Sequence, residues 1–269
     1  MMTTAAGSLR RMEAVLLRHL YLYPQSLSRL MEIFYWPVLD LLVWGFLAVY
    51  ISRNPGSVSH WGAFLLGAMI LWDILFRCQQ AVCLSFLEEV WSRNLLNLFA
   101  SPLSPQEFLA STMLLSLVKF FMAAAVTVSL AWALYSFNLF QIGLWLIPLV
   151  FNLIVMGWAI GIVTTAIILR YGERAEVLAW GLGLLIQPFG AVFYPVSILP
   201  GPFQIVAYAL PCTYVFEGMR QVISTQTMSS SYLVIAFGLN AVYFNAAWLF
   251  FKFMYRRAQE QGRLTKLGE

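Results

Sequence analysis

Long apolar stretches alternate with short polar segments along this chain. A helix that crosses the hydrocarbon core of a bilayer needs about 20 predominantly apolar residues. Stretches of this kind lie at residues 33–52, 61–84, 108–137, 142–169, 177–196 and 232–254. The pattern predicts an all-α polytopic membrane protein in which residues 1–269 form a single transmembrane domain with six spanning helices.

The third and fourth stretches are joined without a charged residue. Residues 120–169 contain no Asp, Glu, Lys or Arg, and one helix of that length, at about 1.5 Å per residue, would far exceed the thickness of a bilayer. We therefore expect a tight hairpin turn at Tyr135–Gln141, with the flanking helices as antiparallel neighbours. Gly157 and Gly161 form a small-xxx-small pair in the second helix, which predicts close packing against another helix.

Composition supports the membrane assignment. Hydrophobic residues make up 61% of the chain and charged residues only 10%, against about 25% charged in soluble domains. The mean hydropathy is +0.78. These values exclude a disordered, collagen-like or disulfide-rich chain. The three cysteines, Cys78, Cys83 and Cys212, have no CxxC spacing and are predicted to be free buried thiols.

Basic residues indicate the orientation, because Lys and Arg gather in cytoplasmic loops. With the N-terminus inside, twelve basic residues fall on the cytosolic side and two, Arg53 and Arg220, fall outside. This bias predicts a multi-pass protein of the bacterial inner (plasma) membrane with both termini in the cytosol. Since the basic residues separate apolar stretches and form no patch, no nucleic-acid partner is expected. The twelve are Arg10, Arg11, Arg18, Arg29, Arg93, Arg170, Arg174, Lys252, Arg256, Arg257, Arg263 and Lys266.

The N-terminal segment 8–31 is amphipathic. Its apolar residues recur at three- and four-residue steps, and Arg10, Arg11 and Arg18 lie off that stripe. We interpret the segment as an interface helix that lies flat on the cytosolic surface of the membrane. A helix packed on a partner would give the same stripe. The stripe consists of Leu9, Met12, Leu16, Leu20 and Tyr23.

Prolines gather at the end of the fifth stretch and after it. Five of the eleven lie within 24 residues, while the 40 residues 177–216 carry no charge. A straight helix does not tolerate this proline density, and so long an apolar segment exceeds one crossing. We expect the span to break near Tyr194–Pro195 and the external segment 197–220 to form re-entrant helices before the last span. The five are Pro188, Pro195, Pro200, Pro202 and Pro211.

Residues suited to catalysis are scarce. A phosphate-binding P-loop needs Lys followed by Ser or Thr, whereas Lys119, Lys252 and Lys266 are followed by Phe, Phe and Leu. The two histidines, His19 and His60, lie far apart in the chain, which excludes a clustered His site. No GxSxG motif occurs. We expect no catalytic residue, no metal site and no cofactor in this chain.

Charges inside the apolar stretches are costly and often functional. Asp73 and Arg77 lie four residues apart near the cytosolic end of the second stretch. An intrahelical ion pair is the interpretation we favour, and a contact with substrate is the alternative. Asp40, one turn into the first stretch, would cap a helix or face the interior of the bundle.

The loop after the second stretch predicts a short amphipathic cytosolic helix at 86–101, stopped by Pro102. Glu88, Glu89 and Arg93 are expected to be exposed on it, as on a docking element. Its apolar positions are Val90, Leu95, Leu98 and Phe99.

Two segments resemble the permeases of ABC type-2 transporters. Residues 88–104 read EEVWSRNLLNLFASPLS, similar to the loop in which a short helix and a Ser-Pro-Leu-Ser-like turn follow the second span. Residues 193–200 read FYPVSILP and continue through Leu210-Pro211 to Glu217 and Arg220, similar to the external segment of the same family. Many relatives carry a Gly-Thr-Leu-Glu-like run where this chain has residues 94–97, so Glu88 and Glu89 are expected to supply the acidic contact.

The resemblance covers essentially the whole chain and implies the permease subunit of an ATP-driven exporter. Such a permease pairs with a second copy of itself and with two ABC ATPase subunits, which bind ATP and Mg²⁺, and it exports lipids, glycoconjugates, polysaccharides or hydrophobic drugs. The implied coupling residues are Glu88, Glu89, Trp91, Arg93, Asn94, Asn97 and Pro102. The implied translocation path includes Trp36, Asp40, Trp44, Tyr50 and Tyr194, and the implied external gate includes Pro195, Pro200, Pro211, Glu217 and Arg220.

Other interpretations compete with this one. For each aromatic residue of the path, the alternative is a belt at the lipid interface. An ion-gradient-driven secondary transporter would need paired intramembrane carboxylates or broken helices in both halves. Here only the second half is broken, and Asp40 and Asp73 are isolated. An intramembrane enzyme would need a nucleophile and a base, which the chain does not offer.

Overall fold

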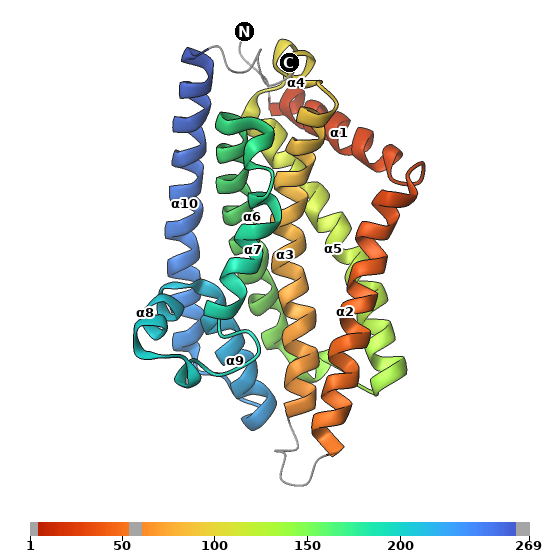
Figure 1. Ribbon diagram of the computed structural model, residues 1–269, viewed down its shortest axis with the longest axis vertical. Helices are drawn as coiled ribbons and strands as arrows, with labels where there is room; N and C mark the ends of the chain where they lie inside the picture. Colours follow the sequence, from red (N-terminus) through yellow and green to blue (C-terminus); the bar gives the residue numbers. More distant parts are fainter. Residues whose placement is uncertain (1–4, 54–60, 262–269) are drawn as a thin grey trace.

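The structure, a computed structural model, describes residues 5–53 and 61–261, and all regular secondary structure in these ranges is helical. Arg263, Lys266 and His60 lie outside the described residues. Five helices are long and apolar enough to cross a membrane, and Figure 1 shows them as one bundle with α10 at one edge and α2 at the other. They are α2 (Leu27–Arg53), α3 (Trp61–Trp91), α5 (Pro105–Tyr135), α6 (Leu146–Tyr171) and α10 (Ser230–Glu260).

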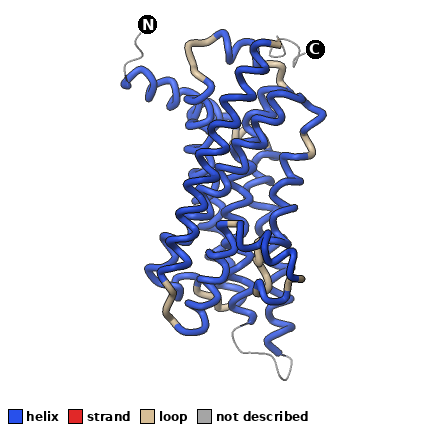
Figure 2. Tube along the Cα trace, turned by 90° about the vertical axis from the view of Figure 1, so that its left-hand side faces the viewer, coloured by secondary structure: helices blue, strands red, loops and turns tan. Residues whose placement is uncertain are grey.

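Shorter helices close the two ends of the bundle (Figures 1 and 2). α1 (Ala5–Leu22) and α4 (Leu95–Ala100) lie at one end, here called the α4 end. α8 (Gly201–Ala209) and α9 (Pro211–Thr225) lie at the opposite end, called the α8 end. The last turn of α10 also lies at the α4 end. The first and last described helices therefore reach the same side, as expected for termini that share one side of a membrane.

The predicted fifth span, 177–196, is wrong in its length, because the helix found there is shorter. α7 (Leu178–Phe189) has only 12 residues, which at about 1.5 Å per residue cover little more than half of the hydrocarbon core. It ends before the predicted break at Tyr194–Pro195, and the chain continues through η3 (Val196–Ile198) into α8 and α9. Because α6 ends at the α4 end and α10 begins at the α8 end, the chain still crosses between them, in pieces.

Two other predicted helices are each divided by a turn. The predicted interface helix 8–31 ends at Leu22, and α2 begins at Leu27 after a turn that contains Pro24. The predicted coupling helix 86–101 consists of the last turns of α3 followed by the separate α4. Arg93, between them, has a left-handed backbone with φ 54°, a conformation that interrupts a right-handed helix.

The predicted tight hairpin at Tyr135–Gln141 is only partly present. α5 ends at Tyr135, and a short turn leads into the 3₁₀-helix η1 (Leu139–Trp145), which precedes α6. η1 therefore occupies part of the predicted turn and delays the start of α6.

α3 is the central helix and is buried along most of its length. α6 packs mainly on α3 and α10, and α5 packs mainly on α3. α5 and α6 touch where the Trp158 indole donates to the Ser116 hydroxyl at 2.7 Å, but they are not each other's main packing partners. A Cβ atom on Gly157 would lie 2.6 Å from the Leu75 carbonyl oxygen, and one on Gly161 would lie 2.8 Å from that of Gln79. The predicted close packing at this glycine pair is confirmed, and it brings α6 against the backbone of α3.

A strong local sequence signal marks the start of α5. The Ser104 hydroxyl accepts from the Glu107 amide at 3.2 Å, and the Glu107 carboxylate accepts from the Ser104 amide at 2.8 Å. Together with Pro105 at the first helical position, this capping box fixes where the helix begins. It also fixes Glu107 close to α1.

Candidate functional site

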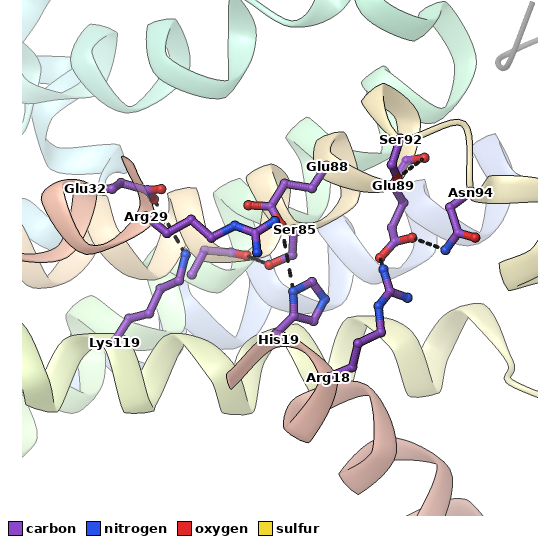
Figure 3. A network of polar contacts seen from close by, with 11 residues as sticks. Arg18, His19, Arg29, Glu32, Ser85, Glu88, Glu89, Ser92, Asn94 and Lys119 are labelled. Carbon is purple, nitrogen blue, oxygen red and sulfur yellow. Dashed lines mark hydrogen bonds and ion pairs between the residues drawn. The ribbon is translucent and has the colours of Figure 1, made fainter. Parts of the chain in front are cut away.

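Paired charges join α1, α2, α3 and α5 at the α4 end (Figure 3). Arg18 of α1 forms an ion pair with Glu89 of α3. The side-chain amide of Asn94, which lies in the turn before α4, donates to the same carboxylate at 2.6 Å. Glu89 has no exposed surface. One buried carboxylate therefore connects α1, α3 and the turn into α4.

A second group of charges connects α2 to α3 and α5. Arg29 of α2 lies 3.3 Å from the Glu88 carboxylate of α3. Lys119 of α5 lies 3.6 Å from the Glu32 carboxylate of α2 and 5.0 Å from the centre of the Tyr23 ring. Lys119 is only 6% exposed. Its charge is thus balanced inside the protein, close to the corner between α1 and α2.

A third pair fixes α1 to the start of α5. The Arg11 guanidinium donates to both carboxylate oxygens of Glu107, at 3.1 Å and 2.5 Å, which is the strong two-pronged geometry. Arg10 is exposed. Leu16 and Leu20 pack against buried residues of α2 and α5. The apolar stripe of α1 is therefore attached to the bundle.

The predicted exposure of Glu88 and Glu89 is wrong. Glu89 is buried and Glu88 is half-buried, because both carboxylates face the basic residues of α1 and α2. A carboxylate in such a position needs its cation, since an unpaired buried charge costs several kcal/mol. These two residues belong to an internal network and do not form an acidic outer surface.

Other side chains at the α4 end do face outward. Trp91 is 46% exposed, and its indole N–H donates to the Glu176 carboxylate at 3.3 Å. Asn97 is exposed and donates to Asn94 at 3.1 Å. Glu176 follows η2 (Gly172–Ala175), so two separate loops contribute to this side. We call the outward-facing set the docking surface, and it consists of Trp91, Arg93, Asn97, Pro102 and Glu176.

His19 is buried beside the second group of charges. Its Nδ1 lies 3.9 Å from the Glu88 carboxylate, and its Nε2 has no hydrogen-bond partner among the described residues. Burial, together with the positive charges of Arg18, Lys119 and Arg29, lowers the pKa of His19 from its ordinary value of 6.5 to about 4. Burial and three cations outweigh one carboxylate, so His19 is neutral at pH 7.

This lowered pKa predicts that the protein loses stability in mild acid. In the unfolded chain His19 binds a proton near pH 6.5, whereas in the fold it does so only near pH 4. The fold therefore keeps its full stability above pH 6.5 and loses up to about 3 kcal/mol as the pH falls from 6.5 to 4. Thermal unfolding in detergent between pH 7.5 and 4.5 measures this. Since carboxylates also titrate in this range, the test is the difference from His19→Gln, whose unfolding temperature should fall less; identical pH profiles would contradict the prediction.

The outer face of α2 carries three of the predicted path residues. Trp36 and Tyr50 are 61% and 66% exposed, and Asp40 is exposed between them. Val43 and Leu47 lie on the same stripe, which advances by three and four residues. We call this stripe the α2 face. A carboxylate exposed on a membrane-spanning helix is costly unless a protein partner or a water-filled path covers it.

The favoured ion pair in α3 is confirmed. The Nε of Arg77 lies 2.6 Å from the Asp73 carboxylate. Its Nη1 donates to the Glu32 carbonyl oxygen of α2 at 3.0 Å. Arg77 therefore neutralises Asp73 and also holds α3 to α2.

Glu217 and Arg220 of α9 organise the broken segment at the α8 end. Arg220 lies 2.7 Å from Glu217 and donates from Nη2 to the carbonyl oxygens of Ala191 and Tyr194, at 3.0 Å each. The Glu217 carboxylate accepts from the Val196 amide at 2.8 Å. Non-helical backbone is permitted within a membrane only where protein or water satisfies it. Glu217 and Arg220 supply hydrogen-bond partners to the non-helical backbone between α7 and α8.

Two aromatic residues of the predicted path have structural contacts at the α8 end. Trp44 stacks on Phe193, with ring centroids 4.1 Å apart and planes 14° from parallel. The Tyr194 hydroxyl donates to the Pro188 carbonyl oxygen at 2.5 Å. Trp44 therefore joins α2 to the broken segment, at the edge of the α2 face.

The prolines of the predicted gate lie where helices begin. Pro195 and Pro200 immediately precede η3 and α8, and Pro211 is the first residue of α9. A proline is tolerated there because the first amides of a helix have no intrahelical acceptor. Arg220, 4.3 Å from the centre of the Phe64 ring, holds this region against α3.

The sequence patterns predict no role for three acidic residues of the site, which are Glu32, Glu107 and Glu176. Each lies at or near the end of an apolar stretch, as the arginines of the α4 end do. The available signal is that acidic and basic residues gather at the same ends of the stretches. That signal predicts pairing, but it does not say which helices meet.

Long apolar helices in one bundle, a network of ion pairs at one end and a broken proline-rich segment at the other are the features of a multi-pass membrane protein. The family profile described as ABC-2 type transporter matches residues 24–224, and the chain belongs to that family. It is therefore an ABC permease, a class of membrane subunit that works with an ABC ATPase. No curated protein matches the chain.

Proposed function

We propose that this chain is the permease subunit of an ATP-driven exporter in a bacterial inner membrane. The α4 end faces the cytosol and binds a separate ABC ATPase subunit through the docking surface. Two copies of the chain meet at their α2 faces and form the translocation path. The cargo is a lipid, a glycoconjugate or polysaccharide, or a hydrophobic drug.

The continuous set of contacts behind the docking surface is the observation that carries the proposal. Asn94 precedes α4 and holds Glu89, and Glu89 holds Arg18 of α1. From α1 the contacts continue through Arg11 to the start of α5. A displacement of α4 therefore moves α1 and the cytosolic ends of the spans together, as ATP-driven coupling requires.

Asp40 supports the placement of the path. It is exposed on the α2 face, on a membrane-spanning helix, with apolar and aromatic residues on either side. A second copy covering this face, with water between the two copies, gives the carboxylate the environment that it needs. The aromatic rings of Trp36 and Tyr50 offer flat apolar contacts to lipid chains or sugar rings.

Coupling to an ion gradient has less support. Such a transporter would use free carboxylates that bind and release a cation. Asp73 is already neutralised by Arg77 at 2.6 Å, and Glu32, the other carboxylate of α2, is paired with Lys119 at 3.6 Å. Asp40 therefore lacks a second free carboxylate on its helix.

Affinity purification of the tagged chain from its native membrane tests the ATPase partnership. We expect an ABC ATPase subunit to co-purify and the chain alone to hydrolyse no ATP. Trp91→Ala should reduce the co-purified ATPase by about tenfold, because an exposed tryptophan at the centre of an interface commonly contributes at least about 1.4 kcal/mol.

Trp132→Ala is the matched control. Trp132 is 67% exposed on α5, towards the α8 end and far from the docking surface. This variant should retain the ATPase. Equal retention by both variants would remove the docking surface from the proposal, and ATP hydrolysis by the purified chain alone would refute the dependence on a partner.

A cysteine cross-link tests the pairing of two copies. Val43 is 65% exposed on the α2 face, and Leu249 is 66% exposed on α10. Mild oxidation in native membranes should link Val43→Cys into a covalent dimer and leave Leu249→Cys monomeric. The native Cys78, Cys83 and Cys212 are buried and free, so they do not compete. A dimer through position 249, or none through position 43, would place the interface elsewhere.

A further inference from the structure

A groove of about 270 Å³ lies between α6 and α10. These helices form the side of the bundle away from α2, so the groove is separate from the α2 face (Figure 1). Aromatic rings and carboxamides share its walls, and the residues that matter here are Phe151, Asn152, Trp158, Asn240, Phe244 and Asn245.

The carboxamides of the groove leave hydrogen-bonding capacity unused. Asn240 is 2% exposed, and its Nδ2 donates to the backbone and side-chain oxygens of Asn152 at 3.0 Å and 2.8 Å. The Oδ1 of Asn240 has no donor among the described residues. Asn245 is exposed, and its amide donates to the Ala241 carbonyl oxygen at 2.7 Å, with its own Oδ1 left for another partner.

These amides lie at the depth of the hydrocarbon core. Asn240 comes ten residues after the start of α10 at Ser230, about 15 Å along the helix, which is close to half of a core about 30 Å thick. Water is absent at that depth, and an unpaired polar group there is costly. The Asn240 Oδ1 is enclosed by the protein, whereas the exposed Asn245 carboxamide needs a donor from whatever occupies the groove.

The size of the groove decides what that occupant is. A helix has a diameter of about 10–12 Å with its side chains, and a groove of about 270 Å³ has no room for one. An acyl chain is thin enough to lie between Phe151 and Phe244. We propose that the groove binds the acyl chain of a membrane lipid that carries a hydroxyl or amide N–H donor along the chain, and that Asn245 accepts from it.

Photo-crosslinking tests the proposal with the full-length protein in phosphatidylcholine nanodiscs, using a diazirine-bearing fatty acid as the probe. We expect saturable cross-links in the α6 and α10 peptides that line the groove. Ala241→Trp, which fills the groove from its wall, should reduce them at least about fivefold, equivalent to about 1 kcal/mol. Val242→Trp adds the same side chain one residue further on, at a position 65% exposed, and should leave them unchanged.

Competition tests the hydrogen-bond donor. A fatty acid with one hydroxyl group at mid-chain should displace the probe at a concentration about tenfold lower than the same chain without it, the effect of one net hydrogen bond. Asn245→Leu, at an exposed position, should remove this difference. Cross-links that persist in Ala241→Trp would overturn the groove as a lipid site, and equal competition by the two fatty acids would overturn the requirement for a donor.

Discussion

Replacing Arg18 with alanine is expected to lower the free energy of unfolding by about 3–5 kcal/mol. The reason is the carboxylate that it leaves behind. Glu89 has no exposed surface, and among the described residues its carboxylate is held by Arg18 and the Asn94 amide. Without Arg18, the buried Glu89 carboxylate loses its cation and keeps the neutral Asn94 amide as a donor. Thermal unfolding in detergent at pH 7.5 should show a decrease of about 10 °C or more.

A second substitution separates this cause from loss of packing. In Arg18→Ala with Glu89→Gln, the side chain at position 89 is neutral and needs no counter-charge, so most of the lost stability should return. Arg10→Ala is the control on the same helix, because Arg10 is exposed. A double variant as unstable as the single one would show that Arg18 acts through its bulk, and it would weaken the account of coupling through Glu89.

Replacing Arg220 with methionine is expected to reduce export more than tenfold and to lower the free energy of unfolding by about 3 kcal/mol. Arg220 donates hydrogen bonds from Nη2 to the carbonyl oxygens of Ala191 and Tyr194, and it balances the charge of Glu217. Methionine keeps an unbranched apolar stem but has no guanidinium, so all three interactions are removed. The break between α7 and α8 then loses the donors that satisfy it. Export of the cargo in reconstituted vesicles and thermal unfolding measure the two effects.

Two variants serve as controls for Arg220→Met. Arg220→Lys keeps the charge but lacks the planar fork that reaches two carbonyls, so its activity should lie between those of the wild type and the methionine variant. Arg53→Met makes the same change at an exposed arginine, also at the α8 end of the bundle, and should export normally. Full activity of Arg220→Met would show that the broken segment holds its shape without this residue.

The course of the chain follows from the hydropathy pattern. Four of the six predicted spans coincide with α2, α3, α5 and α10, and the majority of their ends agree to within a few residues. α6 begins slightly later than predicted because η1 precedes it. Burial of an apolar stretch of about 20 residues in the bilayer is favourable whatever its neighbours are. The composition of a window of that length is therefore enough to predict a span. Confirmed local signals include the glycine pair of α6 and the Asp73–Arg77 pair, because both depend on spacing within one helix.

The site was less predictable, since its interactions join residues far apart in the chain. Arg18 and Glu89 are 71 residues apart, and Arg11 and Glu107 are 96 apart. Polar residues at the end of a predicted helix are usually exposed, which is why the pattern places Glu88 and Glu89 on the outside. In the fold, α1 turns back across the ends of α3 and α5 and covers these carboxylates.

The sequence by itself determined that this is a multi-pass membrane protein, which stretches cross, and that the segment after residue 177 breaks. These are properties of composition and of proline chemistry, which act locally. The tertiary structure alone decided where the fifth crossing breaks, which carboxylates are buried, and which face of α2 stays open with Asp40. Each of these depends on what another helix brings alongside, because the energy of a charge or an unpaired backbone group is set by its surroundings in space.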